Sequence, residues 1–177
     1  SNLLSEFSFL QKKYDLKPLP QYLWKFLRLR PQNFPTIRLA QFAALVTKSS
    51  HLFSKVLAIN ETRQIIDLFK DLPVNRYWKR HYRFGVEVPR VSSTLGIESI
   101  HNILVNSVAV TLYSYGKFTG KQELIERAIQ LLELIPFETN HITKRFMELG
   151  MKAGNADRSQ ALLQLKKSYC DTKKCLT

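Results

Sequence analysis

The chain has 177 residues, enough for one sizeable hydrophobic core, and its 45% hydrophobic and 11% aromatic content is typical of a folded protein and excludes a disordered one. Lys and Arg number 27 against 14 Asp and Glu, which gives a formal charge of +13 and an isoelectric point near 9.9. Residues 1–90 hold 16 of these cations and 6 of the acids, whereas residues 91–177 hold 11 and 8. Such an excess favours polyanionic partners, either nucleic acid or an acidic surface.

No segment is long and apolar enough to suggest a membrane span. The most apolar stretch, ILVNSVAVTLY at 103–113, is too short to cross about 30 Å of hydrocarbon and contains Asn106. No signal-peptide pattern is present, so we expect a cytoplasmic protein without membrane contact. The sequence opens in SNLLSEF without Met, and we expect it to be processed or to be a piece of a longer protein.

The spacing of apolar residues predicts an all-α fold, a single multi-helix orthogonal bundle over residues 1–177. In chain order, helices are predicted at 37–48, 51–58, 61–72, 97–115, 121–135, 140–149 and 158–169, with no convincing alternating strand. The helix at 97–115 is apolar on nearly every side, so we expect it at the centre, closed by Gly116. Asp157 with Gln160 forms a capping-box pattern, and 166–177 forms a basic, Cys-containing tail.

The segment RLRPQNFP at 28–35 places arginines around two prolines. Pro31 and Pro35 restrict the residues before them, so Arg30 and Phe34 should be extended. The resulting stiff loop carries Arg28 and Arg30 toward a helix N-terminus, where guanidinium groups and free N–H groups suit phosphate. The interpretation that we favour is that the arginines pair with carboxylates elsewhere in the protein and the prolines only set the angle at which the chain enters the helix; phosphate binding is the rival interpretation.

The helix after Pro35 is apolar on most sides. We expect it to be largely buried, with one narrow polar strip formed by Arg38, Gln41 and Lys48. Arg38 therefore joins Arg28 and Arg30 as a candidate phosphate ligand.

The segment RYWKRHYRFG at 76–85 interleaves cations with aromatic rings. Single-strand binders need cations for phosphates and flat rings for bases, so this is the best functional signal in the chain. If the segment is helical, Trp78 and Tyr82 share one face. The alternative, equally weighted, is that the rings are core and the charges a solvated rim. The candidate nucleic-acid-binding residues are Arg28, Arg30, Arg38, Arg76, Trp78, Lys79, Arg80, Tyr82 and Arg83.

For the other polar groups, a structural role is favoured over a role in catalysis or ligand binding. His101, Asn102, Asn106 and Ser107 lie in apolar surroundings, which favours a polar network between helices. Cys170 and Cys175 alone cannot complete a zinc or iron–sulfur site, so free thiols are expected and a metal is the less favoured alternative. ALVTKSSHLFSKVL lacks the turn glycine of a helix-turn-helix. No nucleophile, acid–base pair or phosphate loop is present, so we expect no cofactor and no catalytic residue.

Four segments resemble the C-terminal half of an uncharacterised bacterial family of unknown function: LRPQNFPTIRLAQFAAL, YWKRHYRFG, LGIESIHNILVNSV and DRSQALLQLKKSYCDTKKCL. The resemblance covers residues 16–176. Longer members look similar to restriction-endonuclease-like nucleases in their N-terminal half, which implies that this chain is a helical partner of a nuclease module. In relatives the tail continues with a third cysteine, which implies that Cys170 and Cys175 could belong to an incomplete metal or cluster site.

Together these features predict a non-catalytic module that binds nucleic acid, DNA or RNA, or positions it for a nuclease-like domain. The alternative is a structural module that docks its own N-terminal half or an acidic partner. A structure with the two basic segments on one face favours binding, whereas scattered or paired arginines favour docking.

Overall fold

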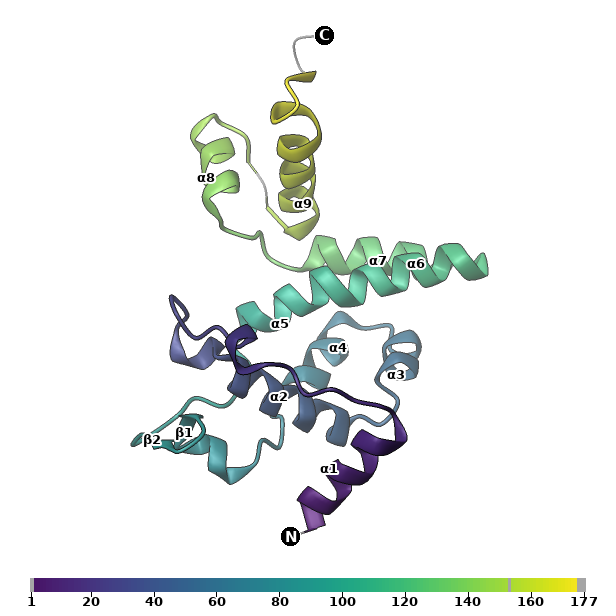
Figure 1. Ribbon diagram of the computed structural model, residues 1–177. Coiled ribbons are helices and arrows are strands. Elements are labelled where there is room, and N and C mark those ends of the chain that lie inside the picture. Colours follow the sequence, from purple (N-terminus) through teal and green to yellow (C-terminus); the bar gives the residue numbers. More distant parts are fainter. Residues whose placement is uncertain (1, 153, 175–177) are drawn as a thin grey trace. The chain divides into compact units, whose positions relative to one another are not determined.

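The computed structural model describes residues 2–152 and 154–174 (Figure 1). Helices dominate it, and the one small sheet in the described residues has two strands, which confirms the predicted all-α class. Contacts divide the chain into two compact units: unit 1 comprises 1–40 and 76–93, and unit 2 comprises 41–75 and 94–177. The boundary falls within one helix, α2 (Pro35–Lys48). The single domain stays a prediction, and each unit is described by itself.

Besides the first residues of α2, unit 1 contains a helix, short 3₁₀ turns and a small sheet. In chain order these are α1 (Asn2–Lys13), the 3₁₀ turns Gln21–Leu23 and Pro31–Asn33, the 3₁₀ turn Arg76–Lys79, β1 (His81–Arg83) and β2 (Val86–Glu87). Sequence reasoning predicted neither α1 nor the strands. Its buried apolar side chains include Ile37 and Val91, whereas most of its large apolar residues are exposed. Unit 1 therefore has little hydrophobic core of its own.

The aromatic and basic segment forms a β-hairpin, so the helical alternative for residues 76–85 is wrong. β1 and β2 pair antiparallel with His81 opposite Glu87 and Arg83 opposite Val86, and a bulge lies between the two pairs. Gly85 makes the turn at φ 70°, a left-handed conformation that glycine adopts without strain. Hydrogen bonds extend the pairing beyond the strands, from Val88 N to Arg80 O at 2.7 Å.

Unit 2 is a set of packed helices. They are α3 (Leu52–Ala58), α4 (Thr62–Phe69), α5 (Ile97–Ile103), a π-helical segment (Leu104–Ala109), α6 (Val110–Thr119), α7 (Gln122–Leu134), α8 (His141–Glu148), α9 (Ala156–Leu165) and a second π-helical segment (Lys166–Cys170). α5 and α6 form one continuous rod through the first π segment, and α7 packs along α6 (Figure 1). Its core includes Ile100, Leu104, Leu112, Leu131 and Ile135.

Gly116 does not close the long helix, which continues to Thr119 and ends at Gly120 with φ 68°. Gly116 is instead buried where α6 meets α7. A Cβ atom there would lie 2.9 Å from Ile125 Cγ1 and 3.0 Å from the Lys121 carbonyl oxygen. The glycine is therefore explained by the close approach of two helices, and the left-handed cap lies four residues later.

Two caps differ from the sequence expectation. The last long helix begins two residues earlier than predicted, because the Asn155 side chain accepts a hydrogen bond from Arg158 N at 3.0 Å and Asp157 lies inside the first turn. α4 ends at Phe69, before Pro73. At α8 the Asn140 side chain accepts from the Thr143 amide, and the Asn140 amide donates to the Thr143 hydroxyl at 2.9 Å, which together form a capping box.

The predicted polar strip of α2 and the predicted polar network of the long helix are both wrong. Gln41 is 3% exposed, whereas Leu39, Phe42 and Val46 are about half exposed, so the buried side of α2 is not the one expected. A helix that is apolar on most sides does not reveal which side is covered. In the long helix Asn102, Asn106 and Ser107 are exposed, and Asn106 Nδ2 donates to the Asn102 carbonyl at 3.0 Å.

Candidate nucleic-acid interface

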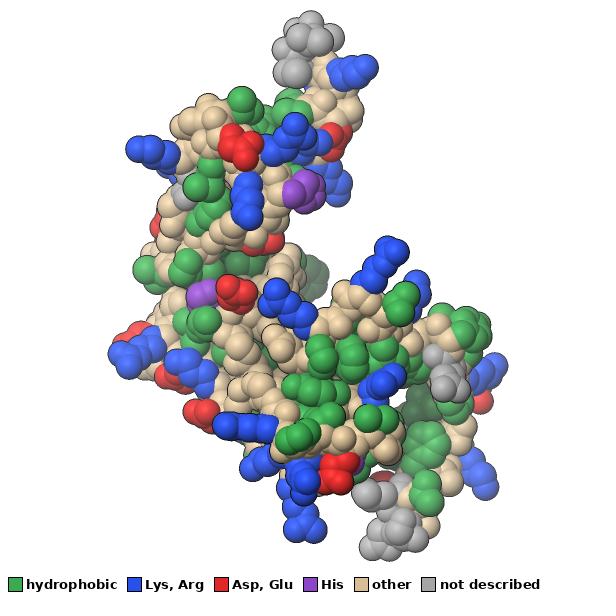
Figure 2. Space-filling view, turned by 90° about the vertical axis from the view of Figure 1, so that its left-hand side faces the viewer, with side chains coloured by type: hydrophobic (Ala, Val, Ile, Leu, Met, Phe, Trp, Pro, Cys, Tyr) green, Lys and Arg blue, Asp and Glu red, His purple; other side chains and the backbone are tan. Residues whose placement is uncertain are grey.

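Positive charge is concentrated in unit 1. Its residues include 12 Lys and Arg against 3 Asp and Glu, whereas unit 2 has 15 against 11. The unit with little core thus carries most of the excess charge of the chain. Figure 2 shows one face of the molecule, where Lys and Arg side chains surround a group of hydrophobic side chains in the lower part of the view.

The proline loop has the predicted backbone. Arg30 and Phe34 are extended, with ψ 142° at both positions, and the 3₁₀ turn Pro31–Asn33 lies between them. Arg38 Nη2 donates to Asn33 Oδ1 at 2.6 Å, which fixes the loop to α2. Burial lowers the pKa of the Arg38 guanidinium from its usual value. Arg38 therefore holds the loop in place, as the interpretation without phosphate binding predicts.

A first group of rings seats the hairpin on the start of α2. Phe34 meets Phe26 edge-on at 5.0 Å and Tyr82 edge-on at 6.3 Å between ring centroids. The Thr36 hydroxyl donates to the Tyr82 carbonyl. The Arg83 guanidinium lies 5.9 Å and 6.0 Å from the centroids of the two phenylalanine rings, within cation–π range. Tyr82 and Arg83 are thus part of the contact between hairpin and helix.

A second group of rings surrounds the hairpin turn. Tyr77 stacks on His81 at 3.8 Å between centroids with an interplanar angle of 8°, and His81 Nδ1 lies 2.9 Å from the Tyr77 carbonyl oxygen. Trp78 meets Tyr77 and Phe84 edge-on, each at 5.1 Å. The Gly85 amide donates to the Tyr77 hydroxyl at 3.0 Å. These contacts fix the turn and its rings together.

The candidate cations differ in what they touch. Arg80 Nε lies 3.0 Å from Glu87 Oε1 across the hairpin, in an exposed ion pair. The exposed side chains of Arg28, Arg30, Arg76 and Lys79 have no partner among residues 2–152 and 154–174. Unit 1 brings all the candidates together, but only these four are unengaged in the described part of the chain.

The ring best placed to meet a ligand is one that sequence reasoning did not select. Trp78 and Tyr82 are half-buried, whereas Phe84 is 73% exposed beside Gly85. Phe26 and Phe34, which hold the hairpin, were also missed. The signal for Phe84 was the following glycine, because a glycine at a turn marks the tip of a hairpin.

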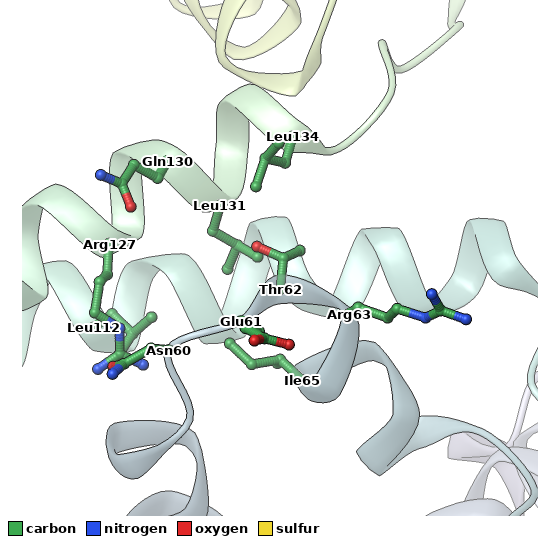
Figure 3. Close-up of a pocket in the computed structure, with 10 residues that line it drawn as sticks. All are labelled: Asn60, Glu61, Thr62, Arg63, Ile65, Leu112, Arg127, Gln130, Leu131 and Leu134. Carbon is green, nitrogen blue, oxygen red and sulfur yellow. The ribbon is translucent and has the colours of Figure 1, made fainter.

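Unit 2 contains a cavity of about 340 Å³ (Figure 3). Its lining comes from the start of α4 and the facing sides of α6 and α7: Asn60, Glu61, Thr62, Arg63, Ile65, Leu112, Arg127, Gln130, Leu131 and Leu134. Arg127 donates to the carbonyls of Val56, Leu57 and Ile59, and Glu61 accepts from Gln64. Two charged groups of the cavity are therefore already satisfied by the protein.

The structure says little about the predictions for metal binding by Cys170 and Cys175 and for membrane contact. Cys170 is exposed and free, and Cys175 lies outside the described residues. No group of three or more metal-ligating side chains occurs among the residues that the structure describes. Within that same part of the chain, no helix has the length and apolarity to cross a membrane.

Fold and site together define a class, a mainly α-helical protein with a strongly basic unit that exposes several cations and the ring of Phe84. The chain belongs to the family described as "Protein of unknown function (DUF2851)", whose model matches residues 1–141. This confirms the predicted membership of an uncharacterised family; the nuclease-like N-terminal half stays a prediction. No curated protein and no solved structure matches the chain.

Proposed function

We propose that unit 1 is a non-catalytic nucleic-acid-binding module. The observation that carries the proposal is the balance of 12 cations to 3 acids in this unit, with Arg28, Arg30, Arg76 and Lys79 lacking a described partner. Unengaged cations release counterions from a phosphate backbone without first losing a protein contact. In the setting that the family resemblance suggests, the module holds nucleic acid for a nuclease-like domain.

Arg76 and Lys79 offer the sharpest test of this proposal. Both lie in the 3₁₀ turn that precedes the hairpin, so their replacement removes two charges without removing a described contact. Arg80 and Arg83 are poorer test positions, because Arg80 pairs with Glu87 and Arg83 lies over two rings. Loss of binding in an Arg80→Ala, Arg83→Ala variant would mix lost phosphate contacts with a disturbed hairpin.

The experiment is fluorescence anisotropy with labelled single-stranded DNA, duplex DNA and RNA over a salt series. Each phosphate contact contributes about −0.7 to −0.9 to the slope of log K against log salt, so Arg76→Ala with Lys79→Ala should flatten the slope by about 1.4 to 1.8. The control is Lys144→Ala with Arg145→Ala in α8, which removes the same charge from unit 2. Equal slopes for the two variants, or no binding at low salt, would refute the proposal.

A second function is favoured by a different observation. Unit 1 exposes many large apolar side chains, among them Leu4, Phe7, Phe9, Tyr14, Leu16, Leu19, Tyr22, Leu23, Leu27 and Leu29. Exposed apolar side chains on a basic unit suit an acidic protein surface, in keeping with a docking module. Absence of salt-dependent binding to any oligonucleotide would favour this second function over the first.

A further inference from the structure

We infer that the turn of the hairpin is a stacking platform for an unpaired base, centred on Phe84, and that the ligand of unit 1 is therefore single-stranded nucleic acid. This inference rests on the proposed function and deepens it by naming the ligand class. It also moves the stacking role from Trp78 and Tyr82, where the sequence suggested it, to the tip of the hairpin.

The first argument is exposure. Phe84 is 73% exposed, so at least one face of its ring is open to solvent. Tyr82, by contrast, packs against Phe34, and one face of Tyr77 is covered by His81. Among the rings of the hairpin, Phe84 has the π face most available to a base.

The second argument is support. An isolated exposed phenylalanine is common on protein surfaces and indicates nothing by itself. Phe84, however, is held by Trp78 at 5.1 Å and by Tyr77 at 6.2 Å, and Tyr77 is fixed in turn by its hydroxyl contact with Gly85 and its stack on His81. A ring held in advance loses little conformational entropy when it binds.

The third argument is the position of the cations. Arg76 and Lys79 precede the hairpin by a few residues and have no described partner. A ring that stacks on bases beside cations that track the backbone is the arrangement that single-strand binding requires. Stacking on an aromatic side chain contributes about 1–3 kcal/mol per base and tolerates any sequence.

Duplex nucleic acid fits this arrangement less well. Its bases are already stacked on one another, so Phe84 would have to enter as a wedge and separate a base step at a cost of about a few kcal/mol. A two-stranded ribbon can also enter a major groove, but here β2 has only two residues, and one of them is the acidic Glu87. An unpaired base reaches the ring without either penalty.

The test compares Phe84→Leu with Phe118→Leu in the full chain. Both replacements remove an exposed aromatic ring and keep apolar bulk, and Phe118 is 88% exposed in unit 2. The probes are a deoxyadenylate 12-mer, an abasic 12-mer with the same number of phosphates, the riboadenylate 12-mer and a 12-base-pair duplex, measured by anisotropy over a salt series.

We expect the wild-type chain to bind the deoxyadenylate strand about 5- to 150-fold more tightly than the abasic strand, the ratio that corresponds to stacking of one base. Phe84→Leu should abolish this ratio and leave the salt slope unchanged, whereas Phe118→Leu should change neither. The RNA arm shows which sugar is preferred.

The possible failures are distinguishable. Salt-dependent binding with no difference between deoxyadenylate and abasic strands, or an unchanged ratio in Phe84→Leu, overturns the stacking platform and leaves the proposed function standing. Tighter binding of the duplex than of the single strand also overturns it, in favour of a wedge. No salt-dependent binding of any probe overturns the proposed function and this inference with it.

Discussion

Arg127 ties α7 to the end of α3, and its replacement should destabilise the protein. The guanidinium donates to the carbonyl oxygens of Leu57 at 2.8 Å and Val56 at 3.0 Å, and also to that of Ile59. These carbonyls lie in the last turn of α3 and just beyond it, where they lack partners within the helix and where positive charge is favourable. Burial lowers the pKa of the Arg127 guanidinium, and Glu123 acts in the opposite direction.

The magnitude follows from the three donations. A hydrogen bond to a charged group contributes about 1.5–3 kcal/mol, but Arg127 is half-buried and water can reach the freed carbonyls, so each donation should count for about 1 kcal/mol. We therefore expect Arg127→Met, which keeps an apolar stem, to lower the free energy of unfolding by about 2–3 kcal/mol. For a chain of this length, this corresponds to a fall in Tm of about 4–12 °C.

The assay is thermal unfolding followed by circular dichroism, with Arg127→Lys as the matched variant. Lysine keeps the charge but offers a single nitrogen, so it should recover only part of the loss. A fall in Tm of less than about 2 °C for Arg127→Met would refute the reasoning, because the three contacts would then contribute nothing beyond what water supplies.

Two further predictions concern stability. Gly116→Ala should lower the free energy of unfolding, measured in urea, by about 1–2 kcal/mol. Backbone atoms at the start of α7 leave no room for the new methyl group, and this clash costs more than the better helix propensity of alanine gains. Gly154→Ala, with open space around it, should be neutral or stabilising. Burial lowers the pKa of His101 from its usual 6.5, against an opposing effect of Glu98, so neutral His101 is favoured in the folded state. Its contribution to stability should be present above pH 6.5 and lost as the pH falls through the lowered pKa. His101→Gln should therefore flatten the dependence of Tm on pH below 6.5, and an unchanged dependence would contradict this assignment.

The helices of unit 2 could be predicted because their apolar residues repeat at helical spacing over enough turns. The amphipathic α7, predicted at 121–135, lies at Gln122–Leu134, and the short α3, predicted at 51–58, lies at Leu52–Ala58. The predicted boundary was wrong where either of two polar residues could cap the helix, as Asn155 and Asp157 could at α9. A cap depends on local backbone geometry, which residue type alone does not determine.

The hairpin could not be predicted in the same way. Its strands have three and two residues, too few for an alternating pattern, and its rings at 78 and 82 also match the spacing of a helix. The assignment of 76–85 to nucleic-acid binding stays a prediction. Partners were not predictable: Arg38 with Asn33 and Arg80 with Glu87 come from chain folding, not from spacing.

The π-helical segment Leu104–Ala109 holds one residue more than the same turns of a regular α-helix would need. At about 100° per residue, an uninterrupted α-helix would place Gly116 about 160° around the axis from the buried Ile100. Because the π-helical segment takes up one extra residue, the angle between the two positions falls to about 60°. A relative with one residue fewer at 104–109 would therefore present the same buried face on an ordinary α-helix. The same deletion within α6, before Gly116, would turn this glycine away from Ile125 and separate the two helices that it allows to meet.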